Sequence, residues 1–474
     1  MNKEARHFAK SILYTVTSNI LSLAISTIVI LVVPKLFGVQ EYGYWQLYAF
    51  YTSFVGFLHF GWNDGIYLRY GGQDYKQLDK KLFFSQFYML IIFELLIGIM
   101  IILMTLLWIT DVERNFIILM SVFSMFILNV RYFLFFVLQA TNRIKEFSKL
   151  TILDRVLYAV ILVIMLVLGV RDYRYLIYAE LLARGITLVF TMFSCREIAF
   201  AKLKSFTFTF SEMRKNISVG VKLMFATIAS LLIMGVVRFF IERSWDIATF
   251  GKVSLTISIS NLMMVFITTV GIVIYPLLRR AKHEDLADIY QLIRNLLSPF
   301  LLGVLIFFNP LRYLLLQWLP NYAESIKYMA IIFPIVVYEG LMSLLVNTFF
   351  KTIRAEAKLL HFNVITLALS VILTIISTIV LHNLELSIVS ILVLLATRCI
   401  LSELWITHKL GIDIRIEIVK EALMTIGFVI SSLVLNPLDG WLVFTLLYVI
   451  YLITKRKSLK HAINEIVHMM KVST

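Results

Sequence analysis

Long uninterrupted runs of apolar residues constrain this chain more than any other feature of its sequence. The clearest runs cover residues 12–33, 82–108, 116–138, 150–170 and 362–381. Each approaches or exceeds the roughly 20 residues that cross the hydrocarbon core of a bilayer as a helix. Because lipid offers the backbone no hydrogen-bond partner, and because these runs lack the alternating polarity of barrel strands, we expect them to be membrane-spanning helices.

The composition agrees with this interpretation. Hydrophobic residues make up 60% of the chain and charged residues only 15%, with a mean hydropathy of +0.88, which excludes a soluble globular protein of this length. The first apolar run is too long for a cleavable signal peptide and lacks a small-residue cleavage site, so it is expected to be the first span. The two cysteines, Cys195 and Cys399, predict no disulfide framework.

Apolar blocks separated by charged residues or by Pro, Gly and Asn predict about 14 spans. Their approximate ranges are 11–33, 43–65, 82–108, 116–139, 150–170, 174–195, 217–240, 250–276, 296–316, 327–350, 360–381, 386–408, 420–436 and 440–454.

The distribution of basic residues predicts the orientation. With a cytoplasmic N-terminus, about 30 of the 44 Lys and Arg residues, Arg294 among them, fall on inward segments and about 7 on outward ones. This bias predicts that both termini are cytoplasmic. The net charge of +15 then reflects topology, and no nucleic-acid partner is expected. After Lys455, apolar residues at helical spacing predict a short interfacial helix on anionic lipid, with an ordinary stop-transfer cluster as the alternative.

An internal repeat predicts two parallel halves. Residues 35–47 align with 243–255, 61–69 with 271–279, and 181–186 with 395–400. Each half then holds six spans, and an even number of spans makes the repeat parallel. We therefore predict a six-helix lobe at 1–204, a second at 205–409, appended spans 13 and 14 at 410–454, and a basic cytoplasmic amphipathic tail at 455–474. Two similar bundles that rock against each other suit a transporter.

Ionisable residues inside spans are functional candidates, because an ion at membrane depth is costly unless it is paired or faces a wet cavity. For a cationic substrate-binding cavity the candidates are Arg131, Arg184, Lys222, Arg238, Lys252 and Arg398. For ion coupling or gating they are His59, Asp64, Glu94 and Glu339.

Structural roles compete with these functions. Glu180 and Arg184 are spaced i, i+4, so a local ion pair is an alternative to substrate contact. Arg131 and Arg398 have no acid at i±3 or i±4 and lie too deep to reach the interface, which favours a role in binding the phosphate oxygens of an anion.

Four further candidates have interfacial or packing alternatives. Lys222, Lys252 and Asp64 lie near span ends, where their charged groups can reach the membrane surface. His59 is either a hydrogen-bonded packing residue or a proton carrier.

The sequence lacks the common enzyme signatures. It has no phosphate-binding loop of the G-x-x-x-x-G-K type, no H-E-x-x-H motif and no Cys/His cluster with metal-ligand spacing. We therefore expect neither catalysis nor a cofactor or bound metal.

Several segments resemble a known family. Residues 36–45 (LFGVQEYGYW) and 60–70 (FGWNDGIYLRY) resemble the opening of polysaccharide-export flippases of the Wzx type. Residues 138–145 (LQATNRIK), 208–211 (FTFS) and 220–223 (GVKL) resemble later segments of that family. The likeness covers roughly residues 8–410. The family belongs to the MOP superfamily, which also contains multidrug–cation antiporters of the MATE type and the lipid II flippase MurJ.

This resemblance implies two six-helix lobes in a V with a central cationic cavity. It implies movement of an undecaprenyl-diphosphate-linked oligosaccharide across the bacterial cytoplasmic membrane, with H⁺ or Na⁺ as the coupling ion and with glycosyltransferases or a polysaccharide polymerase as partners. The alternatives are a MATE-type exporter, a lipid II flippase and a membrane glycosyltransferase. The first span lacks both the acid typical of drug antiporters and the basic residues typical of MurJ-like proteins.

Overall fold

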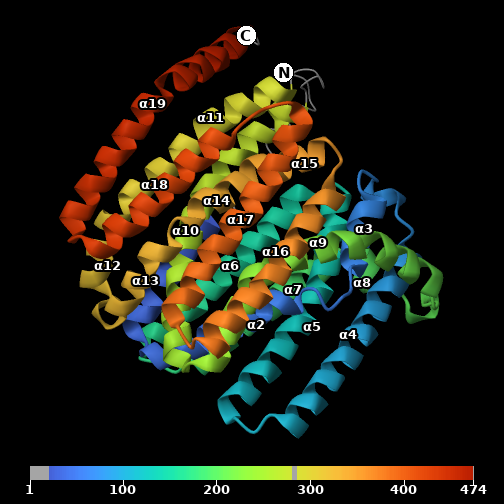
Figure 1. Cartoon of the computed structure of the whole chain (residues 1–474). Helices are drawn as coiled ribbons and strands as arrows, with labels where there is room; N and C mark the ends of the chain where they lie inside the picture. The colour runs from blue at the N-terminus through green and yellow to red at the C-terminus, as the bar shows by residue number, and fades with distance from the viewer. Residues whose placement is uncertain (1–20, 280–285, 473–474) are drawn as a thin grey trace. The chain divides into compact units, whose positions relative to one another are not determined.

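The computed structural model describes residues 21–279 and 286–472, and every regular element within these ranges is helical (Figure 1). The predicted all-α fold is therefore confirmed. Ten helices in the described part are long and apolar enough to cross a membrane, and a bent helix pair makes eleven. The shorter helix Leu21–Leu36, the segment α2–α3 and α18 are three further candidates, so the described part of the chain is consistent with the predicted count of 14.

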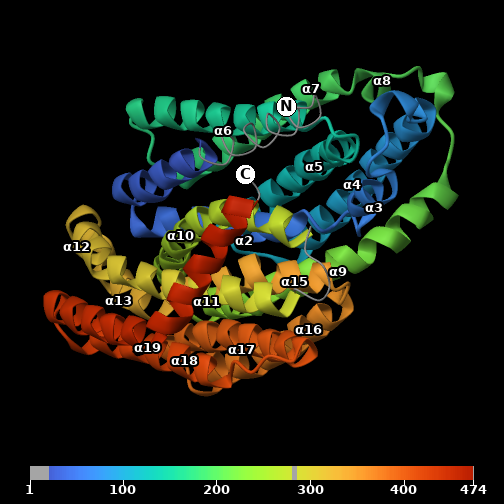
Figure 2. The same cartoon turned by 90° about the horizontal axis from the view of Figure 1, so that it is seen from above.

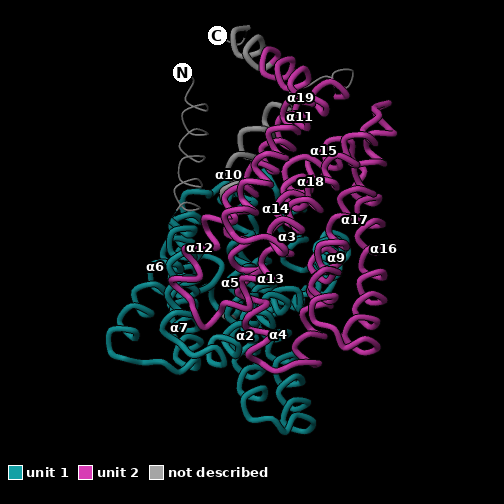
Figure 3. The backbone as a smooth tube through the Cα atoms, turned by 60° about the vertical axis from the view of Figure 1, so that its left-hand side comes forward, with its two compact units in different colours: residues 1–228 teal, residues 229–474 magenta. Residues whose placement is uncertain are grey.

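The chain forms two compact units, Met1–Ile228 and Ala229–Thr474, which Figure 3 colours separately. The division falls inside one long helix, α9. The predicted boundary after residue 204 lies before α9 begins and stays a prediction. The described elements of unit 1 are Leu21–Leu36, α2 (Val39–Val55), α3 (Trp62–Tyr70), α4 (Lys80–Trp108), α5 (Val112–Ala140), α6 (Ile144–Val167), α7 (Tyr173–Ser194), α8 (Arg196–Ala199) and the first part of α9 (Phe210–Ser244).

Unit 2 holds the rest of α9 and the remaining helices. These are α10 (Ile247–Arg279), α11 (Leu286–Val304), α12 (Phe308–Trp318), α13 (Ala323–Ile332), α14 (Ile335–Leu341), α15 (Asn347–Thr352), α16 (Glu356–Thr374), α17 (Leu384–Leu410), α18 (Arg415–Val434) and α19 (Pro437–Val472). Helix α18 packs against α19, and α19 also contacts α11 (Figures 1 and 2).

Local sequence signals explain where several spans begin. Asp79, Asp111, Asp172 and Asn383 immediately precede α4, α5, α7 and α17, and each side chain accepts a hydrogen bond from a backbone N–H of the first turn. Such caps satisfy donors that have no partner within the helix. The ends of these four spans therefore follow from residues that the sequence places just outside the apolar runs.

Burial separates the central helix of unit 1 from the peripheral ones. In the most apolar stretch of α5, 61% of the residues are buried, against 22% in α4 and 11% in α6. The exposed side chains of α4 include Leu96, Ile99 and Leu103. An apolar surface this continuous is unfavourable in water and suits lipid. The chain is thus a multi-pass membrane protein in which α4 and α6 present apolar faces to the bilayer.

Three of the predicted elements differ in detail from the helices of the structure. The span predicted at 43–65 is broken after α2, where Phe60 and Gly61 adopt φ of 51° and 82°. The span predicted at 327–350 bends by 44° beside Pro334 and contains a π-helical turn, Met342–Val346. Proline removes a backbone donor and clashes with the preceding turn, which accounts for the bend. Residues 455–472 continue α19 without a break.

Candidate functional site

The break between α2 and α3 is held by a close approach of two backbones. A Cβ atom on Gly65 would lie 1.9 Å from the carbonyl oxygen of Asn216, and one on Gly220 would lie 2.0 Å from that of Gly61. Only glycine fits such contacts, and Gly61 also needs its positive φ. These glycines let α3 lie directly against α9, whereas the sequence predicted one continuous span over residues 43–65.

Two predicted residues flank this break. The backbone N–H of Gly61 donates to Nδ1 of His59 at 3.0 Å, and Nε2 of His59 lies 3.7 Å from Oδ2 of Asp64. Because Nδ1 accepts, a neutral His59 carries its proton on Nε2, on the side of Asp64. His59 is buried, whereas the Asp64 side chain is 19% exposed.

A polar cavity of about 500 Å³ opens beside the break, within unit 1. Its volume is in the range of small-molecule sites. Residues of α2, α3, α5, α7 and α9, and of the break itself, form its wall. The polar and aromatic lining residues are Thr52, Ser53, Phe57, His59, Asp64, Tyr132, Phe136, Glu180, Arg184 and Thr227. The structure thus brings together three of the predicted residues, His59, Asp64 and Arg184.

Arg184 is fixed at the cavity wall by two partners. It forms an ion pair with Glu180, as the i, i+4 spacing predicts, and donates from Nη1 to Oγ of Ser124 at 2.6 Å. The Arg184 and Glu180 side chains are 16% and 19% exposed, so the pair is part of the wall and still accessible from the cavity. The two partners therefore fix the orientation of the guanidinium at the cavity wall.

Glu94 lies behind the break and does not line the cavity. Its Oε1 accepts from Nδ2 of Asn129 at 3.0 Å, and that same amide donates to the carbonyl of Val55 at 3.1 Å. Val55 is the last residue of α2, and its carbonyl also accepts a hydrogen bond from the backbone N–H of Leu58 at 3.2 Å. Nδ2 of Asn63 donates to the backbone carbonyl of Asn129 at 3.0 Å. Glu94 thus belongs to a buried amide network that supports the broken helix.

Arg131 does not line the cavity, and its guanidinium is paired with Asp154. Its Nη1 donates to Oδ1 of Asp154 on α6 at 2.7 Å, and its guanidinium lies 5.1 Å from the ring centre of Phe135. The Arg131 side chain is only 6% exposed. The partner is on a neighbouring helix, where a search at i±3 and i±4 could not find it.

The predicted residues of unit 2 do not share one site. Arg398 donates to Glu339 of α14 at 2.6 Å and to Ser230 of α9. Arg238 donates to Ser254 at 3.0 Å, and Lys252 pairs with Glu324 at 2.6 Å.

Lys222 differs from the other cationic candidates. It is exposed on α9 and forms no hydrogen bond or ion pair with the described residues.

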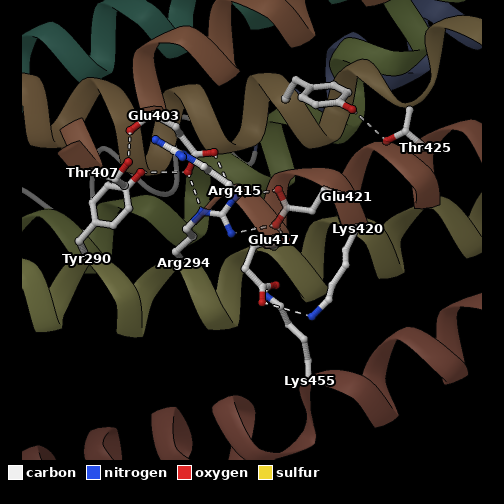
Figure 4. Close-up of polar contacts among 12 residues, drawn as sticks. Tyr290, Arg294, Glu403, Thr407, Arg415, Glu417, Lys420, Glu421, Thr425 and Lys455 are labelled. Atoms are coloured by element: carbon white, nitrogen blue, oxygen red, sulfur yellow. Dashed lines mark hydrogen bonds and ion pairs between the residues drawn. The ribbon is translucent and has the colours of Figure 1, made fainter. Parts of the chain in front are cut away.

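The described part of unit 2 holds a buried charge cluster around Arg294, of which the sequence pointed only to Glu403, as an acidic residue inside a predicted span (Figure 4). Arg294 of α11 donates to both oxygens of Glu403 on α17 at 2.8 and 3.2 Å, and to both oxygens of Glu421 on α18 at 3.0 and 2.8 Å. Tyr290 and Ser298 add one donor each. The sequence placed Arg294 on an inward loop, whereas its side chain is 2% exposed.

Within residues 21–279 and 286–472, no group of three or more His, Cys, Asp or Glu side chains is arranged to hold a metal ion. The polar groups that line the cavity are hydroxyls, two carboxylates, an imidazole and one guanidinium, a set that can exchange hydrogen bonds with a polar ligand.

Comparisons with known proteins give a fold and no family assignment. No family model matches the sequence, and no curated protein matches it. Among solved structures, the lipid II flippase MurJ in an inward closed conformation has a TM-score of 0.67 at 15% identity, covering 94% of this chain and 98% of that one. A MATE family multidrug resistance transporter of the MOP superfamily, in its inward-facing conformation, has a TM-score of 0.65 at 14% identity, covering 83% and 98%.

The outward-facing conformation of such a MATE transporter has a TM-score of 0.57 at 14% identity, covering 85% of this chain and 96% of that one. The chain therefore has the fold shared by MATE transporters and MurJ, as the sequence predicted. At these identities the likeness concerns the fold, and it extends over nearly the whole chain.

Proposed function

We propose that the chain is a flippase that moves an undecaprenyl-diphosphate-linked oligosaccharide across the bacterial cytoplasmic membrane by alternating access. The observation that carries this proposal is the polar cavity of unit 1 in a chain with the fold of a lipid flippase. The prenyl tail stays in lipid while the saccharide and diphosphate cross. The excess of basic residues on the predicted inward segments supports cytoplasmic termini, on the side where glycosyltransferases supply such a substrate.

The lining of the cavity suits a saccharide. Hydroxyls and carboxylates, such as Thr52, Asp64 and Glu180, exchange hydrogen bonds with sugar hydroxyls. The rings of Tyr132 and Phe136 offer apolar faces for the sugar ring. Arg184 supplies a guanidinium that binds phosphate oxygens in a bidentate manner. The cavity therefore contains a group for each polar part of the substrate.

A reconstituted system tests the proposal. Purified protein is placed in vesicles with a polyprenyl-diphosphate-linked oligosaccharide that carries a fluorescent label on its saccharide, and a membrane-impermeant quencher reports the fraction facing outward. We expect the wild type to move the label across the membrane. Arg184→Ala should reduce the rate by about tenfold or more, because charge-assisted hydrogen bonds are lost.

The matched control is Arg171→Ala. Arg171 is exposed and donates to the backbone carbonyls of Leu166 and Val170, away from the cavity. The control should move the label at the wild-type rate. Absence of movement by well-folded wild type would reject the proposed substrate, and an unchanged rate in Arg184→Ala would reject the role of this residue.

A second candidate function is export of small amphipathic cations. Two carboxylates, Asp64 and Glu180, line the cavity against the single guanidinium of Arg184, and an organic cation would be attracted by that excess. Vesicles containing the protein are tested with a fluorescent lipophilic cation in place of the labelled lipid. Transport of the cation without movement of the lipid would establish export and displace the flippase.

A further inference from the structure

A second cavity of unit 1, of about 380 Å³, shares no lining residue with the polar cavity beside the break. Its wall is formed by three connections between helices: residues 74–76 ahead of α4, 141–143 between α5 and α6, and 193–197 at the end of α7 and in α8. All three connections belong to segments that the distribution of basic residues predicts to face the cytoplasm. The cavity therefore lies where four spans begin or end, at the level of lipid headgroups.

The lining of this second cavity holds three cations against two acids. Lys76 and Arg196 are exposed, and neither side chain forms a hydrogen bond or an ion pair with the described residues. Both acids already have a partner within the protein. Asp74 accepts from the backbone N–H of Lys76 at 3.1 Å, and Glu197 lies 3.7 Å from Nζ of Lys80. The charge that remains available to a ligand is therefore positive.

The third cation, Arg143, is fixed in place by its neighbours. Its Nε donates to Oε1 of Glu146 at 3.3 Å, and its Nη1 donates to the carbonyl of Ser194 at 3.2 Å. The guanidinium also lies 4.5 Å from the ring centre of Tyr75. Nη2 has no hydrogen-bond partner in the described part of the chain. Arg143 thus keeps a donor for the oxygens of a phosphate, which guanidinium groups bind well.

Aromatic residues beside the second cavity indicate contact with lipid. Phe193 lines the cavity, and its ring lies 5.4 Å from that of Phe200; both side chains are more than half exposed. Further along the same segment, the rings of Phe208 and Phe210 stack at 5.7 Å and are also more than half exposed. Exposed aromatic rings next to basic side chains are typical of the membrane–water interface. A soluble anion would not account for this apolar surface, whereas a lipid would.

We propose that the second cavity binds the phosphate group of an anionic phospholipid from the cytoplasmic leaflet. Lys76, Arg143 and Arg196 bind the phosphate oxygens, and the rings of Phe193 and Phe200 lie along the acyl chains. A headgroup whose only charge is its phosphate, such as that of phosphatidylglycerol, balances the excess of one cation. Its hydroxyls can donate to the carboxylates of the wall. A zwitterionic headgroup has no net charge and leaves the excess uncompensated.

A headgroup bound in this cavity joins connections that are far apart in the sequence. Residues 71–79 link α3 to α4, and the backbone N–H of Gly72 donates to the carbonyl of Ala140, the last residue of α5, at 2.9 Å. Helix α8 packs against α4 and α7 (Figure 1). A phosphate shared by Lys76 and Arg196 adds a link between the first connection and α8. Bound lipid should therefore raise the Tm of the protein.

Binding is tested on the purified full-length protein in detergent without a transport substrate, so the result does not depend on the proposed function. Thermal unfolding is followed with phosphatidylglycerol, phosphatidylethanolamine or phosphatidylcholine at equal mole fraction, and with inorganic phosphate or glycerol 3-phosphate at the same total concentration. Native mass spectrometry records the lipid molecules that stay bound. We expect a phosphatidylglycerol adduct, and a higher Tm with this lipid than with any other additive.

The decisive variant combines Lys76→Gln with Arg196→Gln. Both side chains are exposed and lack a partner among the described residues, so the variant should fold and keep the wild-type Tm in phosphatidylcholine. Its affinity for phosphatidylglycerol should fall by about tenfold or more, because each basic residue near the membrane surface contributes to the binding of anionic lipid. The matched control is Lys149→Gln, at an exposed lysine of α6 that lies on a predicted inward segment and does not line the cavity. The control should bind the lipid like the wild type.

Equal Tm values of the wild type in phosphatidylglycerol and in phosphatidylcholine would overturn the site, and so would unchanged lipid binding by the double variant. An equal loss of binding in Lys149→Gln would show a general attraction of the basic surface and reject the cavity as the site. Stabilisation by inorganic phosphate or glycerol 3-phosphate as strong as that by the lipid would assign a soluble anion instead. A preference for phosphatidylethanolamine would reject the anionic headgroup.

Discussion

Glu94 in unit 1 and Glu421 in unit 2 are both buried carboxylates in apolar surroundings, but their partners differ. In unit 2, Arg294 donates to both oxygens of Glu403 and of Glu421 (Figure 4). The hydroxyls of Tyr290 and Ser298 each donate one further hydrogen bond to these carboxylates. In unit 1, Glu94 has one amide donor and one orphan oxygen. A carboxylate whose two oxygens both accept hydrogen bonds is expected to hold helices together, whereas one with an unpartnered oxygen leaves room for a ligand.

The charged side chains of the two units also differ in exposure. Arg294, Glu403 and Glu421 are each at most 5% exposed at the side chain, whereas Asp64, Glu180 and Arg184 line a cavity at 16–19%. The cluster of unit 2 joins α11, α17 and α18. The two sets of charges therefore differ in accessibility: the cluster of unit 2 is enclosed, whereas the charges of unit 1 border a cavity.

The largest effect is expected at Arg294. Arg294→Ala leaves two buried carboxylates with only hydroxyl donors, and breaking a buried ion pair in this way costs about 3–5 kcal/mol. We expect a large fall in Tm and in the yield of folded protein. Thermal unfolding of the purified variant measures this. A Tm equal to that of the wild type would remove the contrast between the two units.

The next effect concerns the break in unit 1. Gly65→Ala would place a Cβ 1.9 Å from the carbonyl oxygen of Asn216, and overpacking of this kind costs about 3 kcal/mol at its upper end. The matched control is Gly185→Ala in α7, where a Cβ meets nothing within 4 Å. The control should keep or slightly raise the Tm. Equal Tm values in both variants would contradict the close backbone contact.

A smaller effect is expected for Arg398→Ala. Its acidic partner, Glu339, is 27% exposed and can be hydrated when the guanidinium is removed. Charge-assisted hydrogen bonds of this kind contribute about 1.5–3 kcal/mol, and exposure of the partner favours the lower end. Unfolding experiments should therefore rank this variant between Arg294→Ala and the wild type. A loss as large as that of Arg294→Ala would show that exposure of the partner does not matter here.

The smallest effect is expected at the surface. Lys327 pairs with Glu385 at 2.8 Å, but both side chains are more than half exposed. Such a pair contributes less than about 1 kcal/mol because water screens it. Lys327→Ala should leave the free energy of unfolding within about 0.5 kcal/mol of the wild-type value, and high salt should erase the difference. A larger loss would mean that this pair is part of a network.

The sequence predicted those features that depend on one helix at a time. The spans at 82–108 and 116–139 match α4 and α5 closely, because apolar length and capping aspartates define them. The pair of Glu180 and Arg184 follows from spacing on α7. The partner of Arg131 could not be predicted, because Asp154 belongs to another helix and its approach depends on packing.

The features missed at the site share one physical cause. The break after Val55 depends on glycines that tolerate backbone contact and on amides from other helices, so hydropathy does not reveal it. Arg294 was assigned to a loop because charge is normally excluded from spans, and its compensation by Glu403 and Glu421 exists only in the folded state. Contacts between helices therefore determine both the break after Val55 and the burial of Arg294.

The unbroken course of α19 has a mechanical consequence. Its 36 residues measure about 54 Å at the rise of an α-helix, against a hydrocarbon core of about 30 Å. The helix is therefore long enough to extend beyond the hydrocarbon core, and it is continuous with the part that packs against α11 and α18. When the packed part tilts slightly, the C-terminal end of α19 moves through a larger distance. A spectroscopic probe near that end would therefore report small movements of the packed part.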